Sequence, residues 1–391
     1  MMKITQMEVT PVAFSDPPLR NSTGCHEPFA LRTLVRLATD DGIVGWGEAH
    51  GGARLLASLE AVREQVIGAD PFALEALRLR VPDPRVYSPL EVACLDIAGK
   101  ALGQPVYNLL GGKVRDQVEF AAYLFYHFDC DPRGECLTPE AMLEQARGMI
   151  AEHGFRALKL KGGVLPPDEE IATIRLLREA LGPEFRLRLD PNAIWSVETS
   201  VRVGKALEGD LEYLEDPVWG MEAMAEVKRQ VNVPLSTNMC LTAFSHFPEG
   251  IRTHAVDVVL SDHHYWGGLL ATKEMAKICE TWGLGVSMHS NSHLGISLAA
   301  MLHAAAATPQ ISYACDTHYV WIDEDILEGP RPAFTDGCMA VPDAPGLGIT
   351  VDEDAVARMA EDYVRCGLTE RGDAQYMRKY VPDWEPLRPR W

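Results

Sequence analysis

The segment FRALKLKGGV (residues 155–164) contains two lysines, Lys159 and Lys161, separated by one leucine. Residues two apart in a strand point to the same face, so the segment predicts a mostly apolar strand that aims two ammonium groups the same way. A stretch with helical periodicity, PPDEEIATIRLLREALG (166–182), follows it. Together the two segments predict one βα unit.

A short apolar segment followed by a helical stretch recurs along the chain. The further strand candidates are RLRLD (186–190), EYLED (212–216), PLSTN (234–238), DVVLSD (257–262), LGVSMH (284–289) and ISYACD (311–316). Strands that are apolar throughout and alternate with helices are typical of a parallel sheet covered on both sides. At least seven such strands at regular intervals favour a closed (β/α) barrel over an open sheet.

A polar residue closes each predicted strand, or directly precedes the last residue of the segment. These residues lie 23 to 29 positions apart: Lys161, Asp190, Glu215, Asn238, Asp262, His289 and Asp316. In a barrel the C-terminal strand ends meet in one cup, where active sites of this fold are found. Polar residues also mark strand ends without any function, but seven in succession that all suit catalysis predict a converging site.

Three of these residues, Asp190, Glu215 and Asn238, offer oxygen donors from successive strands. Hard oxygen ligands on rigid elements suit Mg²⁺, which keeps its other octahedral positions for water or substrate. Alone, each could be a helix N-cap, since Asp and Asn are common there. As a trio at this spacing they predict a Mg²⁺ site.

The lysine pair is a candidate for proton transfer. A lysine beside another cation and near Mg²⁺ has its ammonium form disfavoured, so we expect its pKa to fall toward the range useful for a general base. A substrate carboxylate on the metal would place its α-proton near such a base, and the resulting enediolate would be stabilised electrostatically. The alternative interpretation is two lysines whose stems lie along a surface strand.

Asp262 and His289 close consecutive predicted strands on the other side of the cup. A carboxylate next to an imidazole fixes its tautomer and raises its pKa, which makes the imidazolium a competent acid. A base on one side and an acid on the other predict abstraction of an α-proton with loss of a β-hydroxyl, or racemisation.

The N-terminal part of the chain has a different pattern of apolar and polar residues. Residues 3–13 and 31–49 alternate in strand fashion around a TDDGIVG turn, and the period becomes helical from about residue 53 to 110. This order predicts an α+β module over residues 1–117, followed by the barrel over 118–348.

Composition excludes several classes of protein. The net charge of −20 argues against nucleic acid as a partner, and no apolar run approaches the roughly 20 residues that span a membrane. The start of the chain does not read as a signal peptide, so we expect a cytoplasmic protein. Nine scattered cysteines without CxxC spacing predict buried thiols and not a disulfide framework or a zinc site.

The chain resembles the enolase superfamily, specifically its mandelate racemase-like branch with a K-x-K motif and, within it, the glucarate dehydratase family. The most specific stretches are FRALKLKGGV, LDPNAIWS, LEDPVWG, PLSTNMC, SDHHYWGG, MHSNSHLGISL and DTHYVW. Asn238 as the third metal ligand narrows the resemblance to glucarate dehydratase, because Glu or Asp is commoner there in the superfamily. The resemblance implies a modified (β/α)7β barrel and an α+β capping domain that residues 349–391 complete.

By matching positions, the resemblance implies that Asp190, Glu215 and Asn238 bind Mg²⁺, that Lys161 is the base and that Lys159 contacts the substrate carboxylate. His289, supported by Asp262, would assist departure of hydroxide and act as base for the C5 epimer. Substrate contacts are implied for Asn21, Thr23, His26, Tyr123, Ser290, Asn291, His318 and Arg371.

The implied reaction is dehydration of D-glucarate and L-idarate, small dicarboxylate acid sugars, to 5-dehydro-4-deoxy-D-glucarate by a homo-oligomeric enzyme. Two stretches are shorter than in usual glucarate dehydratases, RVPDPRVYSPLEVA (80–93) and FDCDPRGECLTPEAM (128–142). Two alternatives therefore stay open: a dehydratase or epimerase of another acid sugar such as galactarate, and a non-catalytic paralogue.

Overall fold

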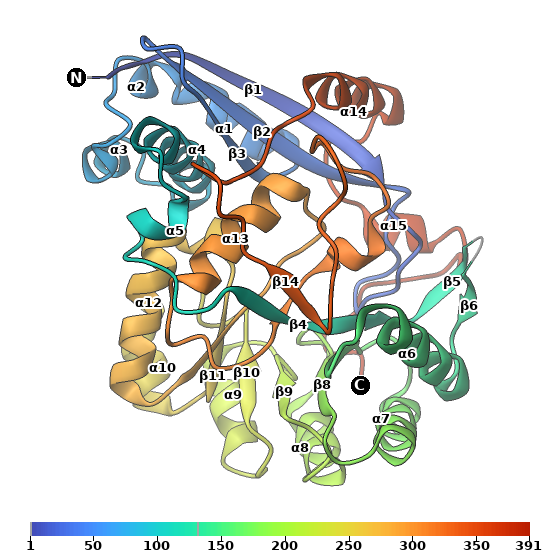
Figure 1. Cartoon of the computed structure of the whole chain (residues 1–391). Helices are drawn as coiled ribbons and strands as arrows, with labels where there is room; N and C mark the ends of the chain where they lie inside the picture. Colours follow the sequence, from blue (N-terminus) through green and yellow to red (C-terminus); the bar gives the residue numbers. More distant parts are fainter. Residues whose placement is uncertain (1, 131–132) are drawn as a thin grey trace.

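The computed structural model describes residues 2–130 and 133–391 and contains two main sheets (Figure 1). The first is an antiparallel sheet in the order β1 (Ile4–Ser15), β2 (Phe29–Thr39) and β3 (Val44–His50). Five helices follow it: α1 (Ala53–Ala61), α2 (Arg63–Val66), α3 (Leu74–Arg80), α4 (Pro84–Leu102) and α5 (Val106–Leu109). The antiparallel sheet with its helices has the α+β composition that the N-terminal sequence predicts.

The second sheet is a barrel of eight parallel strands. Their order along the barrel is β4 (Gln117–Phe125), β7 (Ala157–Lys161), β8 (Arg186–Asp190), β9 (Tyr213–Glu215), β10 (Leu235–Thr237), β11 (Val258–Ser261), β12 (Gly285–Met288) and β13 (Cys315–Asp316). β13 pairs with β4, and the amide of Ser312 donates to the carbonyl of Val286 at 3.0 Å, which brings the two ends of the sheet together. The predicted barrel is confirmed.

Helices cover the outside of this barrel. They are α6 (Pro139–His153), α7 (Pro167–Leu181), α8 (Val197–Ala206), α9 (Met221–Lys228), α10 (Phe247–Thr253), α12 (Leu269–Trp282) and α13 (Gly295–Ala306). The sequence sets their ends locally: the Thr138 hydroxyl accepts from the amide of Ala141 at 3.2 Å at the start of α6, and Gly154 ends that helix with a φ of 73°.

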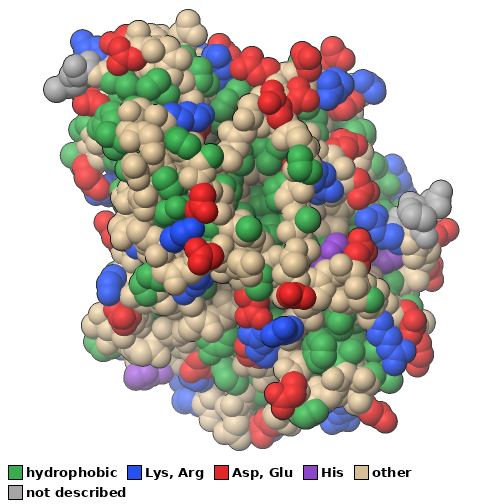
Figure 2. Space-filling model, viewed as in Figure 1, with side chains coloured by type: hydrophobic (Ala, Val, Ile, Leu, Met, Phe, Trp, Pro, Cys, Tyr) green, Lys and Arg blue, Asp and Glu red, His purple; other side chains and the backbone are tan. Residues whose placement is uncertain are grey.

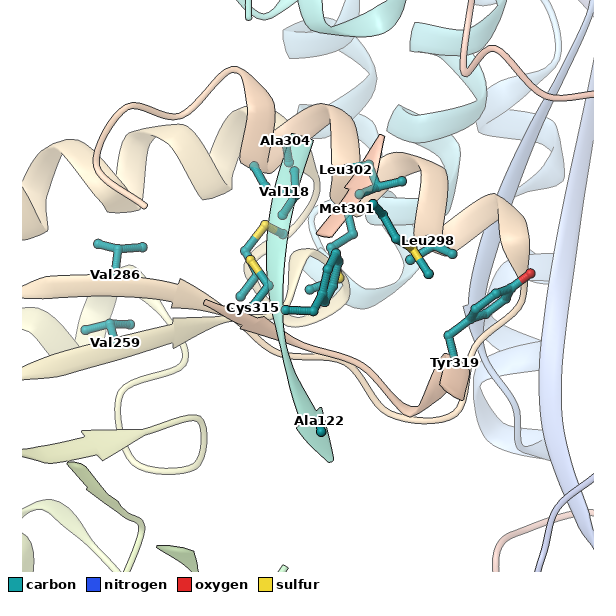
Figure 3. Close-up of a cluster of buried hydrophobic side chains, with 14 of the residues drawn as sticks. Val118, Ala122, Val259, Val286, Leu298, Met301, Leu302, Ala304, Cys315 and Tyr319 are labelled. Atoms are coloured by element: carbon teal, nitrogen blue, oxygen red, sulfur yellow. The ribbon is translucent and has the colours of Figure 1, made fainter. Parts of the chain in front are cut away.

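The strands are buried on both faces, as their apolar composition predicts. All five residues of β7 are buried, and α13 is buried along its whole length. Figure 3 shows Leu298, Met301 and Leu302 of α13 packed with Val118 of β4 and Cys315 of β13. This close packing holds the strand ends at fixed positions.

Smaller elements complete the fold. β5 (His127–Cys130) pairs with β6 (Gly134–Cys136), and β14 (Cys338–Ala340) runs antiparallel to β4. Four short helices lie in loops: η1 (Phe244–His246), α11 (His263–Trp266), η2 (His318–Trp321) and α15 (Asp373–Met377). Helix α14 (Glu353–Cys366) packs against β1, so the C-terminal segment returns to the N-terminal sheet (Figure 1).

The structure describes one of the two short stretches completely and the other in part. Residues 80–93 form a tight connection in which α4 begins only four positions after α3 ends. Residues 131–132 of the stretch 128–142 lie outside the described part of the chain. The eight cysteines whose side chains the structure describes are free thiols, and five of them are buried.

The surface has no large area of one charge in the view of Figure 2, where acidic and basic side chains are interspersed. Among the described residues, no helix has the length and apolar composition required to cross a membrane.

Glu91 joins α4 to the barrel. Its buried carboxylate accepts the amides of Leu269 and Leu270 at the start of α12. Gly268 (φ 108°) must be glycine there, because a Cβ would lie 2.0 Å from Glu91 Oε2. Burial raises the pKa of Glu91 from 4.5 to about 8, against the opposing effect of the two amides.

This raised pKa makes stability depend on pH. The folded state holds a proton on Glu91 that the unfolded chain releases above about pH 4.5, so the free energy of unfolding falls as pH rises from there to about 8. We expect the free energy of unfolding of Glu91→Gln to rise relative to that of the wild type across this window, by at most about 1.4 kcal/mol per pH unit. Urea denaturation of both proteins at pH 5 to 9 measures this, and a difference that does not change with pH contradicts it.

Candidate active site

The seven polar residues singled out in the sequence lie at the C-terminal ends of barrel strands. Lys161, Asp190, Glu215 and Asp316 are the last residues of β7, β8, β9 and β13. Asn238, Asp262 and His289 directly follow β10, β11 and β12. The parallel barrel therefore gathers at one end groups that are up to 155 positions apart in the chain.

The two lysines of β7 point the same way, as their spacing predicts. Lys159 Nζ lies 3.4 Å and Lys161 Nζ 2.7 Å from the same oxygen, Oδ2 of Asp190. Lys161 Nζ also donates to the hydroxyl of Tyr123 on β4 at 3.0 Å. Both lysines are buried, so the surface-strand interpretation is excluded.

Lys159 lies among three carboxylates. Its Nζ is 2.7 Å from Oε1 of Glu215 and 3.1 Å from Oδ2 of Asp316, in addition to Asp190. Burial by itself would lower the pKa of Lys159, but Asp316 and Glu215 raise it well above its usual value. The charges of the protein nearest to Lys159 across the barrel are therefore negative, and they oppose the lowering of its pKa that a neighbouring lysine and Mg²⁺ would cause.

Asp190, Glu215 and Asn238 adjoin one another and form a donor set that fits Mg²⁺. Asn238 Nδ2 donates to Glu215 Oε1 at 3.1 Å, while Glu215 Oε2 is buried and has no hydrogen-bond partner in the described part of the chain. A buried carboxylate oxygen without a partner is costly unless a cation or water completes it. Two carboxylates and an amide oxygen are hard ligands of the kind that Mg²⁺ prefers.

The carboxylate of Asp262 has a different first partner from the one expected. Its Oδ1 accepts from His264 Nδ1 at 2.7 Å, whereas Oδ2 lies 3.8 Å from Nδ1 of His289, which is longer than a hydrogen bond. Burial lowers the pKa of His264 to about 3, so this imidazole is neutral near pH 7. Asp262 thus faces His289 but is held by His264.

The neighbours of His264 lie in the N-terminal sheet. Arg32 Nη2 on β2 is 2.9 Å from His264 Nε2, and Arg32 Nε donates to Glu48 of β3 at 2.7 Å. An arginine can only donate, so His264 accepts at Nε2 and donates from Nδ1 to Asp262. His50 also lies close to Asp262 and His264, but both ring nitrogens of His264 are already engaged, which disfavours a second metal site there.

Removing this arginine should weaken the fold. Arg32 and Glu48 are both buried, and Glu48 also accepts the amides of Leu294 and Ser297 at the start of α13, at 2.8 and 2.9 Å. We expect Arg32→Met to lower the free energy of unfolding by about 3 kcal/mol, the low end for a broken buried pair, because Glu48 keeps both amides. Urea denaturation of the wild type and of Arg32→Met measures this difference in the free energy of unfolding.

Arg36→Met is the matched control. Arg36 lies on the same strand and pairs with the exposed carboxylates of Glu8 and Glu353 at 3.4 and 3.5 Å. Exposed pairs contribute about 0–1 kcal/mol. Equal losses from the two substitutions would contradict the structural role of Arg32.

A cavity of about 380 Å³ opens above these groups. Of the residues that the sequence analysis singled out, its lining contains Asn21, Thr23, Lys161, Asn238, His289, Asn291 and Arg371. Ser290, His26, Tyr123 and His318 are buried outside that lining. The last three form an aromatic cluster, in which the His318 ring centroid lies 4.7 Å from that of Tyr123 and 5.9 Å from that of His26.

Two of the lining residues are held by protein partners. Arg371 bonds both oxygens of Asp373, at 2.7 Å from Nε and 2.6 Å from Nη2. Asn21 Nδ2 also donates to Asp373, at 2.6 Å, and its Oδ1 accepts the amide of Thr23 at 2.8 Å. Asp373 therefore ties the C-terminal segment to the loop that carries Asn21.

Sequence reasoning missed the role of two carboxylates at the site. Asp316 is predicted only as a strand end, yet it contacts Lys159. Asp216 follows Glu215 directly, and its Oδ2 accepts the amide of Asn238 at 2.8 Å, which orients that residue. The acidic pair in LEDP was the available signal for Asp216, whereas the contact of Asp316 depends on closure of the barrel.

Comparison with known proteins identifies the family. Residues 4–111 match the mandelate racemase / muconate lactonizing enzyme N-terminal domain, and residues 141–355 match the enolase C-terminal domain-like family. A probable glucarate dehydratase of Streptomyces coelicolor is 45% identical over 429 aligned positions, which cover 100% of this chain and 99% of the relative.

Comparison with solved structures indicates the same family. An enolase from Thermobispora bispora, complexed with magnesium and formate, is 48% identical with a TM-score of 0.97 and full coverage of both chains. An enolase from Pseudomonas fluorescens with bound magnesium, potassium and tartrate is 45% identical with a TM-score of 0.97, covering 100% of this chain and 99% of that one. The chain therefore belongs to the enolase superfamily, as an enzyme of its acid-sugar dehydratase family with a mandelate racemase / muconate lactonizing enzyme N-terminal domain.

Proposed function

We propose that this enzyme is a Mg²⁺-dependent hydro-lyase for a dicarboxylate acid sugar, with D-glucarate and L-idarate as substrates and 5-dehydro-4-deoxy-D-glucarate as product. One observation carries the proposal: Lys161, Asn238 and His289 line the same cavity, and Asp190 contacts Lys161. The proposed base, one of the proposed Mg²⁺ ligands and the proposed acid thus border one space that can hold a small ligand.

Asp190, Glu215 and Asn238 would hold the Mg²⁺. When bound, the ion supplies a positive charge that fixes one substrate carboxylate and makes the adjacent carbon more acidic. Lys159 would support the same carboxylate by charge, since the carboxylates of Glu215 and Asp316 next to it favour its ammonium form.

The residues of the chain would divide the proton transfers as follows. Lys161, in its neutral form, takes the proton from C5, and the electron pair of that bond moves onto the adjacent carboxylate to give an enediolate. The pair then returns to form the C4–C5 double bond as hydroxide leaves C4. His289 gives its proton to the departing hydroxide, so water is released and the resulting enol tautomerises to the keto acid. L-Idarate has the opposite configuration at C5, so His289 would take its proton.

The relatives support a dicarboxylate. The structures of the Pseudomonas fluorescens relative and of one from Mycobacterium smegmatis, 49% identical, contain tartrate, a hydroxylated diacid. The 429-position alignment with the Streptomyces coelicolor relative exceeds the 391 residues of this chain by 38, in line with the shortened segments, while the Thermobispora bispora relative is covered in full. Another aldarate such as galactarate, reached by the same chemistry, is therefore the second candidate.

A substrate panel tests the proposal. We would incubate the purified protein and Mg²⁺ with mono- and diacid sugars and detect keto acid with semicarbazide. Turnover of D-glucarate and L-idarate, lost with EDTA and restored by added Mg²⁺, is the expected result. Turnover of a different diacid would replace the substrate but keep the mechanism, and no turnover of any acid sugar would support a non-catalytic paralogue.

A further inference from the structure

Arg85 lies at the junction of two cavities. It follows Pro84 at the start of α4, inside the shortened connection, and its side chain is exposed. It lines the 380 Å³ cavity and also a neighbouring cavity of about 550 Å³. Its guanidinium carbon is 5.1 Å from the ring centroid of Tyr265, which lines both cavities as well.

The charge of Arg85 is not compensated. Three arginines line the 380 Å³ cavity, and one of them, Arg371, is neutralised by its two bonds to Asp373. Arg85 forms no ion pair with any carboxylate in residues 2–130 or 133–391. In a chain of net charge −20, a free guanidinium at the edge of the cavity is suited to bind an anion.

The barrel places Arg85 at the far end of the cavity from Asp190. β8 and β12 are four positions apart in a barrel of eight strands and so lie opposite each other. Asn291 follows β12 and donates from Nδ2 to the Tyr265 hydroxyl at 3.4 Å, beneath Arg85. The third arginine, Arg388, instead donates to the carbonyl of Asn192, just after β8, and lies on the metal side.

We propose that Arg85 binds the distal carboxylate of the substrate, next to Tyr265 and Asn291, and makes the enzyme select diacids over monoacids. The inference rests on the proposed function, because it takes the first carboxylate to lie beside Asp190. A six-carbon diacid held there would extend across the barrel toward β12. Arg85 would thus supply, from the shortened connection, the positive charge that the second carboxylate requires.

The test compares a diacid with the monoacid that lacks the distal charge. For Arg85→Gln we expect the KM for D-glucarate to rise about 10–100-fold with little change in kcat, and constants for D-gluconate to stay as in the wild type. Arg85→Lys keeps the charge but not the forked guanidinium, so its KM for D-glucarate should lie between those of the wild type and of Arg85→Gln. Titration of Mg²⁺-loaded Lys161→Met, with and without Arg85→Gln, by D-glucarate and by D-gluconate gives the same comparison without turnover.

Arg54→Gln is the matched control, because Arg54 lines the 550 Å³ cavity but not the other. Two outcomes would overturn the role of Arg85 and leave the proposed function standing. One is that Arg85→Gln raises KM equally for the diacid and the monoacid, and the other is that Arg388→Gln, and not Arg85→Gln, raises KM for the diacid alone. A wild-type protein that neither binds nor converts any diacid would overturn both.

Discussion

Replacing Lys161 by methionine should lower kcat for D-glucarate by at least about 10³-fold, in the upper part of the range for loss of a general base. Lys161 is the lysine that faces the cavity, whereas Lys159 is enclosed by Asp190, Glu215 and Asp316. The substitution removes the only proposed acceptor for the C5 proton of this epimer. It also leaves Asp190 with Lys159 as its remaining lysine partner.

Isotope exchange separates the base from the acid. In D₂O, Lys161→Met should abolish incorporation of deuterium at C5 of D-glucarate, whereas His289→Asn should still allow it, because that variant lacks only the group that assists departure of hydroxide. For L-idarate the two outcomes should be exchanged. Exchange is followed by NMR of the recovered substrate.

Two further variants exclude simpler explanations. Lys161→Arg keeps a positive charge beside Asp190 but carries a group that does not lose its proton, so it should be as inactive as Lys161→Met. Lys277→Met removes an exposed lysine that pairs with Glu280 on α12 and should behave as the wild type. Activity retained in Lys161→Arg would show that charge and not proton transfer is what Lys161 contributes.

The strand ends could be predicted because barrel strands are apolar and polar residues interrupt them at a regular interval. This pattern by itself assigns Asp190, Glu215 and Asn238 to neighbouring strands, and the fold places them at the ends of β8, β9 and β10. The K-x-K spacing likewise predicts a shared direction for the two lysines, and both reach one oxygen of Asp190.

Contacts across the barrel and to the N-terminal sheet could not be predicted in this way. The pKa of Lys159 depends on Asp316, which is 157 positions away and is brought near only when β13 pairs with β4. The partner of Asp262 is His264, whose orientation depends on Arg32, 232 positions before it. A local pattern contains no information on such pairs, so the environment of a charge was the least reliable prediction.

Glu215→Gln should have the second large effect, on metal binding. Glu215 contributes a buried oxygen, Oε2, that has no hydrogen-bond partner in the described part of the chain, and it lies between Lys159 and Asn238. An amide in its place has one acceptor oxygen and no negative charge, so we expect Mg²⁺ affinity to fall by more than the roughly 10–100-fold cost of losing a supporting group around a metal. Calorimetric titration of EDTA-treated protein with Mg²⁺ measures this without reference to turnover.

Glu212→Gln provides the matched comparison from the other end of the same strand. Glu212 immediately precedes β9 and pairs with the buried Arg188 at 2.6 Å, far from the strand ends that carry the site. Its loss should lower the free energy of unfolding, since Arg188 stays buried, but should leave Mg²⁺ affinity unchanged. Glu215→Gln should instead lower Mg²⁺ affinity and change the free energy of unfolding little. Removing one of three carboxylates around Lys159 costs less in folding than in binding a divalent cation. Similar Mg²⁺ affinities for the two variants would mean that the cation is bound elsewhere than at Asp190, Glu215 and Asn238.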